Sequence, residues 1–255
     1  HKPLIVLDGE IDADVASRFI SRCASGLPTL IVNREKLDGP WAALELPAFD
    51  AEQAAILFKQ EARLATNEAD ADVLGLVQML GNSPFAVVIA ARAMLVAKQN
   101  PGGYKTVLQQ VLGATGGDGR VAALTASSRA LSNAYQGLLL ILGATFTGSA
   151  SPEMLSLMGG AQVDAIKQAM NVMTQLNLVQ RIERYGQPHY RMHPITHTFT
   201  KTWLRSSNRL DPLQEKARDS VMRYAQQFGQ DDPAAWDRLA AEMDTFLAAA
   251  DWAAE

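Results

Sequence analysis

Two charged side chains near the start of the chain have the types and spacing to bind a nucleotide. Asp8 directly follows the apolar run of residues 4–7, and Arg34 directly follows a second apolar run, residues 29–33. A carboxylate can hold Mg²⁺ on a nucleoside triphosphate, and a guanidinium can bind its phosphates. The alternatives are that Asp8 only starts a turn and that Arg34 only forms a surface salt bridge.

The elements around these residues predict that both lie at one edge of a sheet. Continuous apolar runs indicate buried strands of a parallel sheet, and Asp12 can cap a helix between them whose apolar stripe ends at Cys23. The carboxyl ends of the two strands of such a unit lie at the same edge, where ligands bind. We expect residues 41–47 to form a further short strand, and the thiol of Cys23 to be buried.

The composition indicates an ordinary soluble globular protein with two or three domains. Of 255 residues, 48% are hydrophobic and 20% are charged, and the formal net charge is -4. A negative balance argues against nonspecific binding to nucleic acid. No apolar run approaches the roughly 20 residues that span a bilayer, and no secretory leader opens the chain, so we expect a cytoplasmic protein without membrane contact. Both ends interrupt a pattern, so we interpret the chain as a piece of a longer protein.

Residues 49–118 have the pattern of a small helical subdomain. Asp50 and Gln53 are spaced as a capping box, and Ser83-Pro84 is a helix start. A glycine-rich loop, residues 113–119, closes this region. It lacks the Gly-Lys-Ser/Thr ending of a phosphate loop and is interpreted as a flexible boundary.

Residues 119–206 have the pattern of a winged helix, which is three helices followed by a β-hairpin. The predicted helices begin with Ser128, with Ser151-Pro152 and at Val163, and the hairpin spans residues 178–193. Such modules read DNA when the third helix is basic.

The third helix carries Asp164 and Lys167 as its only charges, which argues against DNA as a partner. His193 follows the hairpin, immediately before a helix start at Pro194. A histidine in this place is suited to contact an anion or a neighbouring domain.

The last segment, residues 207–255, has the pattern of a helical hairpin. Asp211-Pro212 and Asp232-Pro233 each resemble a cap followed by a first-turn proline, and one wide apolar stripe follows from Trp236. A hairpin this apolar needs further partners, so it would suit the start of a repeat array.

The order of these parts resembles the signal-transduction ATPases with numerous domains (STAND) of the NB-ARC type. Residues 4–8 look like the Walker B strand of this family, and residues 29–34 like the strand that ends in its sensor arginine. Residues 81–86 (GNSPFA) are similar to its Gly-Leu-Pro-Leu-Ala motif, and residues 190–194 (YRMHP) to its Met-His-Asp motif. Residues 236–252 are similar to the first helix of the sensor arrays of bacterial members.

The resemblance implies a fold of α/β followed by all-α. Its expected parts are residues 1–48 as the C-terminal part of the sheet of a P-loop NTPase, 49–118 as the helical subdomain, 119–206 as the winged-helix domain and 207–255 as the start of a TPR-like array. ADP or ATP with Mg²⁺ would be the cofactors.

The resemblance also assigns roles to single residues. Asp8 would hold Mg²⁺ through the nucleotide, Glu10 would replace a second acidic residue absent at Gly9, and Arg34 would bind nucleotide. Pro84 would lie near adenine, and His193 would contact the β-phosphate of ADP. The Walker A loop would lie upstream of His1, so these 255 residues alone would have at most weak ATPase activity.

The implied function is a nucleotide-dependent switch. ADP would hold a closed form through His193, and exchange for ATP would open it and permit homo-oligomerisation, while the repeat array would sense a ligand or protein. Two alternatives are a winged-helix regulator that binds DNA and a degenerate scaffold without nucleotide turnover. The absence of a second acidic residue at Gly9 favours the scaffold.

Overall fold

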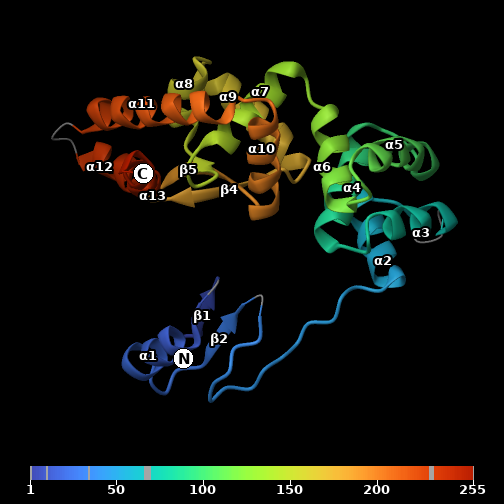
Figure 1. Ribbon diagram of the computed structural model, residues 1–255, viewed down its shortest axis with the longest axis horizontal. Coiled ribbons are helices and arrows are strands. Elements are labelled where there is room, and N and C mark those ends of the chain that lie inside the picture. Colours follow the sequence, from blue (N-terminus) through green and yellow to red (C-terminus); the bar gives the residue numbers. More distant parts are fainter. Residues whose placement is uncertain (1, 10, 34, 66–69, 230–232, 255) are drawn as a thin grey trace. The chain divides into compact units, whose positions relative to one another are not determined.

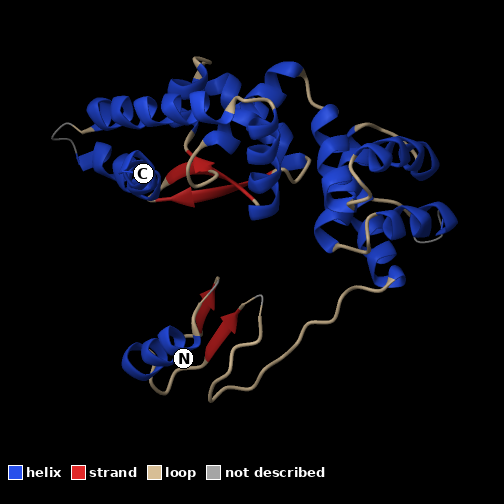
Figure 2. Ribbon diagram, in the orientation of Figure 1, coloured by secondary structure: helices blue, strands red, loops and turns tan. Residues whose placement is uncertain are grey.

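This computed structural model describes residues 2–9, 11–33, 35–65, 70–229 and 233–254. It divides into a first unit, His1–Ala48, and a second unit, Phe49–Glu255. The described chain is mixed α/β and mostly helical, with strands confined to two small sheets (Figure 2). None of the helices in the described ranges is both long enough and apolar enough to cross a membrane.

The first unit is one strand–helix–strand motif (Figure 1). Its elements are β1 (Ile5–Asp8), α1 (Ala13–Cys23) and β2 (Thr29–Val32). β1 and β2 pair in parallel, as the sequence predicts. The carboxylate of Asp12 caps α1 by accepting hydrogen bonds from the amides of Asp14 at 2.7 Å and Val15 at 3.3 Å.

Three expectations for the first unit are wrong. The two strands are half-buried on one face only, because Val6 and Leu30 on the other face keep 53% and 51% of their surface exposed. Cys23 is exposed instead of buried. Residues 41–47 form no strand: Leu44 and Leu46 are 86% and 82% exposed, so the apolar residues there have nothing to pack against.

The second unit begins with five helices that we call the helical bundle. They are α2 (Ala51–Ala62), α3 (Asp70–Met79), α4 (Pro84–Val96), α5 (Pro101–Ala114) and α6 (Gly119–Arg129). The capping box of Asp50 and Gln53 is confirmed at the start of α2. α4 packs between α2 and α6, and α3 packs against α2 and α5. The core where these helices meet is mostly apolar, with Phe58, Leu76 and Ile89 fully buried.

The helical bundle is followed by a module that contains a three-stranded sheet, which we call the strand module. Its elements are α7 (Asn133–Ala144), β3 (Ser149–Ala150), α8 (Pro152–Gly159), α9 (Val163–Gln175), β4 (Val179–Arg184), β5 (Gln187–Met192) and α10 (Pro194–Ser206). The predicted antiparallel hairpin of β4 and β5 is confirmed, and β3 adds a third strand beside β5.

Four helix starts were predicted in the wrong place or missed. α6 was missed and begins after Asp118, whose side chain caps it, and the helix predicted from a cap at Asp211 begins earlier, at Leu210, so Asp211 lies inside it. α7 begins after Ser132, whose hydroxyl accepts from the amide of Tyr135, and not at Ser128, which is buried inside the end of α6. α5 begins at Asn100-Pro101, which the sequence analysis uses only as the end of α4; the Asn100 side chain caps α5 through the amide of Gly103 at 2.7 Å.

Three helices complete the second unit: α11 (Leu210–Phe228), α12 (Pro233–Ala241) and α13 (Met243–Ala254). α11 packs against α8 of the strand module and against both α12 and α13 (Figure 1). The single helix predicted from Trp236 onward is wrong, because the chain breaks it at Glu242. There the amide of Glu242 donates to the carbonyl of Leu239, and the carbonyl of Glu242 accepts the first bond of α13, from Phe246.

Candidate functional site

The predicted metal ligand lies at the edge of the sheet where the sequence analysis expects it. Asp8 is the last residue of β1, in register with Val32 at the end of β2, and its side chain is exposed. The amide of Gly9 donates to the carbonyl of Val32 at 3.2 Å, which joins the two strand ends. The predicted partners Glu10 and Arg34 lie outside the described residues.

Pro84 occupies the first turn of α4 and is exposed, with Ser83 as the N-cap residue. The turn before it contains two successive residues in the left-handed region, Gly81 at φ 64° and Asn82 at φ 52°. Asparagine is one of the few residues that adopt this conformation at small cost. The asparagine of the GNSPFA segment is therefore compatible with a turn where the family resemblance expects glycine.

His193 lies at the junction of β5 and α10 and caps that helix. Its Nδ1 accepts a hydrogen bond from the amide of Ile195 at 3.2 Å. In the neutral ring the proton is therefore on Nε2, which leaves an N–H donor on the other side of the imidazole. Burial, and then the charge of Arg191, lower the pKa of His193, so the ring is neutral at pH 7.

The structure brings the two motif segments of the second unit together. The rings of Phe85, next to Pro84, and of His193 are 4.6 Å apart between centroids, at an interplanar angle of 36°. We call Pro84, Phe85, Arg191 and His193 the His193 site. Two tilted rings in contact, an N–H donor and one guanidinium form a set that suits an aromatic base or an anionic group.

A second contact joins the helical bundle to the strand module. Arg92 on α4 donates to Glu61 of α2 at 2.7 Å and to the side-chain oxygen of Asn177, between α9 and β4, at 3.4 Å. The ion pair is about one-third exposed on each side, at 33% and 27%. The ion pair lies within the helical bundle, so the contacts that join the two parts are the hydrogen bond from Arg92 to Asn177 and the ring contact at His193.

Replacing Arg92 with methionine is expected to lower the free energy of unfolding of the second unit by about 1 kcal/mol, because a partly buried ion pair and one hydrogen bond are lost. The matched control is Arg120→Met, which removes the exposed pair with Asp118 and is expected to change it by less than about 0.5 kcal/mol. Urea unfolding followed by circular dichroism measures both. Equal losses would show that Arg92 has no special place at this interface.

The metal expectation rests on Asp8 alone. Within the described ranges, no three His, Cys, Asp or Glu side chains lie close enough together to hold a metal ion. A single carboxylate still fits Mg²⁺ that arrives with a nucleotide, because Mg²⁺ usually takes one or two carboxylates, the phosphates and water.

Two residues of the His193 site were not among the predicted site residues. Phe85 belongs to the quoted GNSPFA segment, and Arg191 to the quoted YRMHP segment, so both motifs already contained them. The contact between Phe85 and His193 could not be derived from a single sequence, because nothing in the spacing indicates that these two residues meet.

Comparison of the chain with the models of known protein families found no match, and comparison with curated proteins found none either.

Proposed function

We propose that the chain is part of a nucleotide-dependent switch of the STAND type, in which ADP favours a closed arrangement of the helical bundle and the strand module. The observation that carries this proposal is the ring contact between Phe85 and His193, at 4.6 Å between centroids. It joins the segment that resembles the family's proline motif to the segment that resembles its histidine motif. These two segments lie far apart in the sequence and belong to different parts of the second unit.

In this proposal the strand module is a winged helix, and its parts match that description. α7, α8 and α9 precede the hairpin of β4 and β5, and β3 pairs with β5. α11 to α13 would begin the TPR-like array. The first unit would be the C-terminal part of a P-loop NTPase sheet, with a phosphate loop supplied upstream.

Three residues of the His193 site have a defined task in the proposal. The Nε2–H group of His193 donates to a β-phosphate oxygen, and Arg191 adds a positive charge to the same region. Pro84 packs against adenine at the start of α4. In the first unit, taken by itself, Asp8, Glu10 and Arg34 would be the residues that hold Mg²⁺ and phosphate.

The switch requires that ADP and ATP differ in their affinity for the closed and open arrangements. A ligand moves a two-state equilibrium only by its differential affinity, so a few kcal/mol of difference between the two nucleotides are needed. A homo-oligomer would then form from the open arrangement, in response to a ligand or protein bound by the terminal helices.

ADP binding by calorimetry tests this proposal, on the 255-residue chain and on a chain extended upstream to include a phosphate loop. In the extended chain, His193→Ala is expected to weaken ADP by about 10- to 100-fold, since a hydrogen bond to a charged group contributes about 1.5–3 kcal/mol. His193→Asn should weaken ADP equally, although asparagine still caps α10. The control is Tyr185→Ala, at the exposed turn of the hairpin.

Two results would contradict the proposal. One is the absence of ADP binding in the extended chain. The other is an ADP affinity that His193→Asn leaves unchanged, which would show that the histidine only caps α10.

A further inference from the structure

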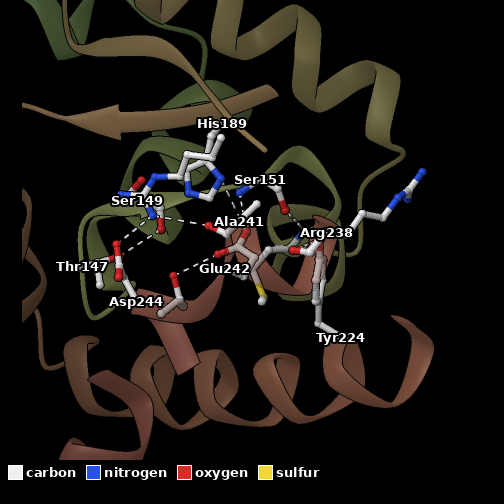
Figure 3. A network of polar contacts seen from close by, with 12 residues as sticks. Thr147, Ser149, Ser151, His189, Tyr224, Arg238, Ala241, Glu242 and Asp244 are labelled. Carbon is white, nitrogen blue, oxygen red and sulfur yellow. Dashed lines mark hydrogen bonds and ion pairs between the residues drawn. The ribbon is translucent and has the colours of Figure 1, made fainter. Parts of the chain in front are cut away.

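A buried carboxylate and a buried imidazole meet where α12 and α13 join the strand module. Glu242, between α12 and α13, and His189, on β5, are each 0% exposed. Among the described residues they are the only acidic residue and the only histidine in the buried class. Nδ1 of His189 lies 3.9 Å from Oε1 of Glu242, and Figure 3 shows the two side chains facing each other beside Ser151.

Glu242 is held by donors on two elements. Its Oε1 accepts from the backbone amide of Ser151 at 2.6 Å, and its Oε2 accepts from the hydroxyl of Thr245 at 2.9 Å. Ser151 is the N-cap residue of α8, so the carboxylate also lies at the positive end of that helix. Because a backbone amide can only donate, this arrangement suits the ionised carboxylate.

His189 is not satisfied in the same way. Neither of its ring nitrogens has a hydrogen-bond partner in the described structure, and 3.9 Å is too long for a direct bond to Glu242. Burial first, and then the nearby charge of Arg184, lower the pKa of His189 to about 4. A buried polar ring without partners is costly, so its retention calls for an explanation.

The elements packed around His189 and Glu242 contribute further charged and titratable groups. Arg184 of β4 forms an ion pair with Asp244 of α13 at 2.9 Å, and this pair also links α13 to the strand module. The phenol of Tyr224 on α11 donates to the carbonyl of Arg238 on α12 at 3.5 Å, and burial raises its pKa to about 12. The remaining carboxylate near this phenol is Glu153 of α8.

We propose that His189 and Glu242 form an acid-sensitive latch, which holds α12 and α13 against β5 and α8 at neutral pH and releases them as the solution is acidified. The latch has two states because its contacts are lost together. If α12 and α13 move away from β5 and α8, Glu242 loses the hydrogen bond from the amide of Ser151, and His189 becomes exposed to water. The inference concerns the docking of α12 and α13 and does not depend on nucleotide binding.

The direction of the pH effect follows from the histidine. The docked state keeps His189 neutral down to about pH 4, whereas the released state takes up a proton near the ordinary value of 6.5. Between these values the released state binds more protons, so docking weakens as the pH falls, by at most about tenfold for each pH unit. Glu242 opposes this effect, since burial raises its pKa and protonation of the carboxyl favours docking.

Energy transfer between two dyes measures the docking directly. One dye is attached through Leu247→Cys on α13 and the other through Tyr185→Cys at the turn between β4 and β5. Both positions are exposed. The natural thiol of the chain is removed by Cys23→Ser. We expect the transfer efficiency to change reversibly between pH 7.5 and 5.0, while circular dichroism shows unchanged helix content. No change in efficiency over this range would overturn the proposal.

Two substitutions in the labelled chain separate the two groups. With His189→Phe, which cannot take a proton, the change between pH 7.5 and 5.0 should disappear. With Glu242→Gln, which keeps the shape but removes the opposing group, release should be steeper. The matched control is Glu183→Gln on the exposed side of β4, which should behave as the unsubstituted chain. A change in transfer efficiency that is as large in His189→Phe as in the chain without this substitution would overturn the proposal.

A measurement without any core substitution guards against variants that fail to fold. The imidazole signals of the four histidines can be titrated by NMR in the natural chain. A His189 signal that takes up its proton below the ordinary pKa of 6.5, over the same pH range in which the transfer efficiency changes, supports the latch. Titration of all four histidines, His189 included, near pH 6.5 while α12 and α13 are still docked would overturn the proposal.

Discussion

Phe58→Ala is expected to lower the free energy of unfolding of the second unit by about 3–5 kcal/mol. Phe58 lies on α2, is 0% exposed and belongs to the core that α2, α3 and α4 share. Truncation removes the ring and leaves a cavity in a close-packed interior, so the transfer and cavity costs add. A loss of this size is a large share of the stability of an ordinary domain.

Urea unfolding followed by circular dichroism measures this effect, with Ile56→Ala as the matched control. Ile56 lies on the same helix but is 58% exposed, so its truncation should change the free energy of unfolding by less than about 1 kcal/mol. Similar losses for the two variants would mean that the buried face of α2 is not the one described.

Gly143→Ala should destabilise the second unit by about 1–3 kcal/mol or more, because α7 and α10 touch at this glycine. A Cβ atom at position 143 would lie 2.3 Å from Oγ1 and 2.5 Å from Cβ of Thr200, which is itself fully buried. Since Cβ of Thr200 is part of the clash, trimming Thr200 to serine would not relieve it. The two helices would have to separate.

The same helix provides the control with the opposite sign. Nothing lies within 4 Å of a Cβ atom added at Gly137, so Gly137→Ala should stabilise the chain by about 0.5–1 kcal/mol through the helix propensity of alanine. Thermal unfolding of both variants would test the pair. Stabilisation by Gly143→Ala would disprove the close contact between α7 and α10.

The sequence predicted those parts of the fold that local chemistry determines. The capping box at Asp50, the serine–proline start of α8 at Ser151 and the Tyr185-Gly186 turn of the hairpin depend on neighbouring residues, and all three are present. Ser128 and Ser132 illustrate the limit. Both can cap a helix, and only the packing of α6 against α4 decides that Ser128 stays inside α6.

Burial was harder to predict, because it depends on contacts between distant segments. Leu44 and Leu46 are as apolar as the residues of a strand, but they have no partner strand in the described structure. Glu242 had a visible signal, as one carboxylate within an apolar stripe. The sequence does not indicate its role, because its partner, His189, lies on another element.

The candidate site follows the same division. Asp8 and His193 were predicted as candidate residues from their position beside a strand end and a helix start. Their chemical setting was not, because it comes from Arg191 and from the ring of Phe85 on α4.

The bond between Glu242 and Ser151 spans 91 residues of chain, and this has a consequence for biosynthesis. The strand module is synthesised before α12 and α13, and domains generally begin to fold as they leave the ribosome. We therefore expect the nascent module to fold with His189 still open to water and Ser151 without its carboxylate. Contacts of such long sequence separation close late. α12 and α13 would then be the last described part of the second unit to assemble, and at neutral pH an exposed His189 imidazole would mark a second unit that is not yet fully assembled.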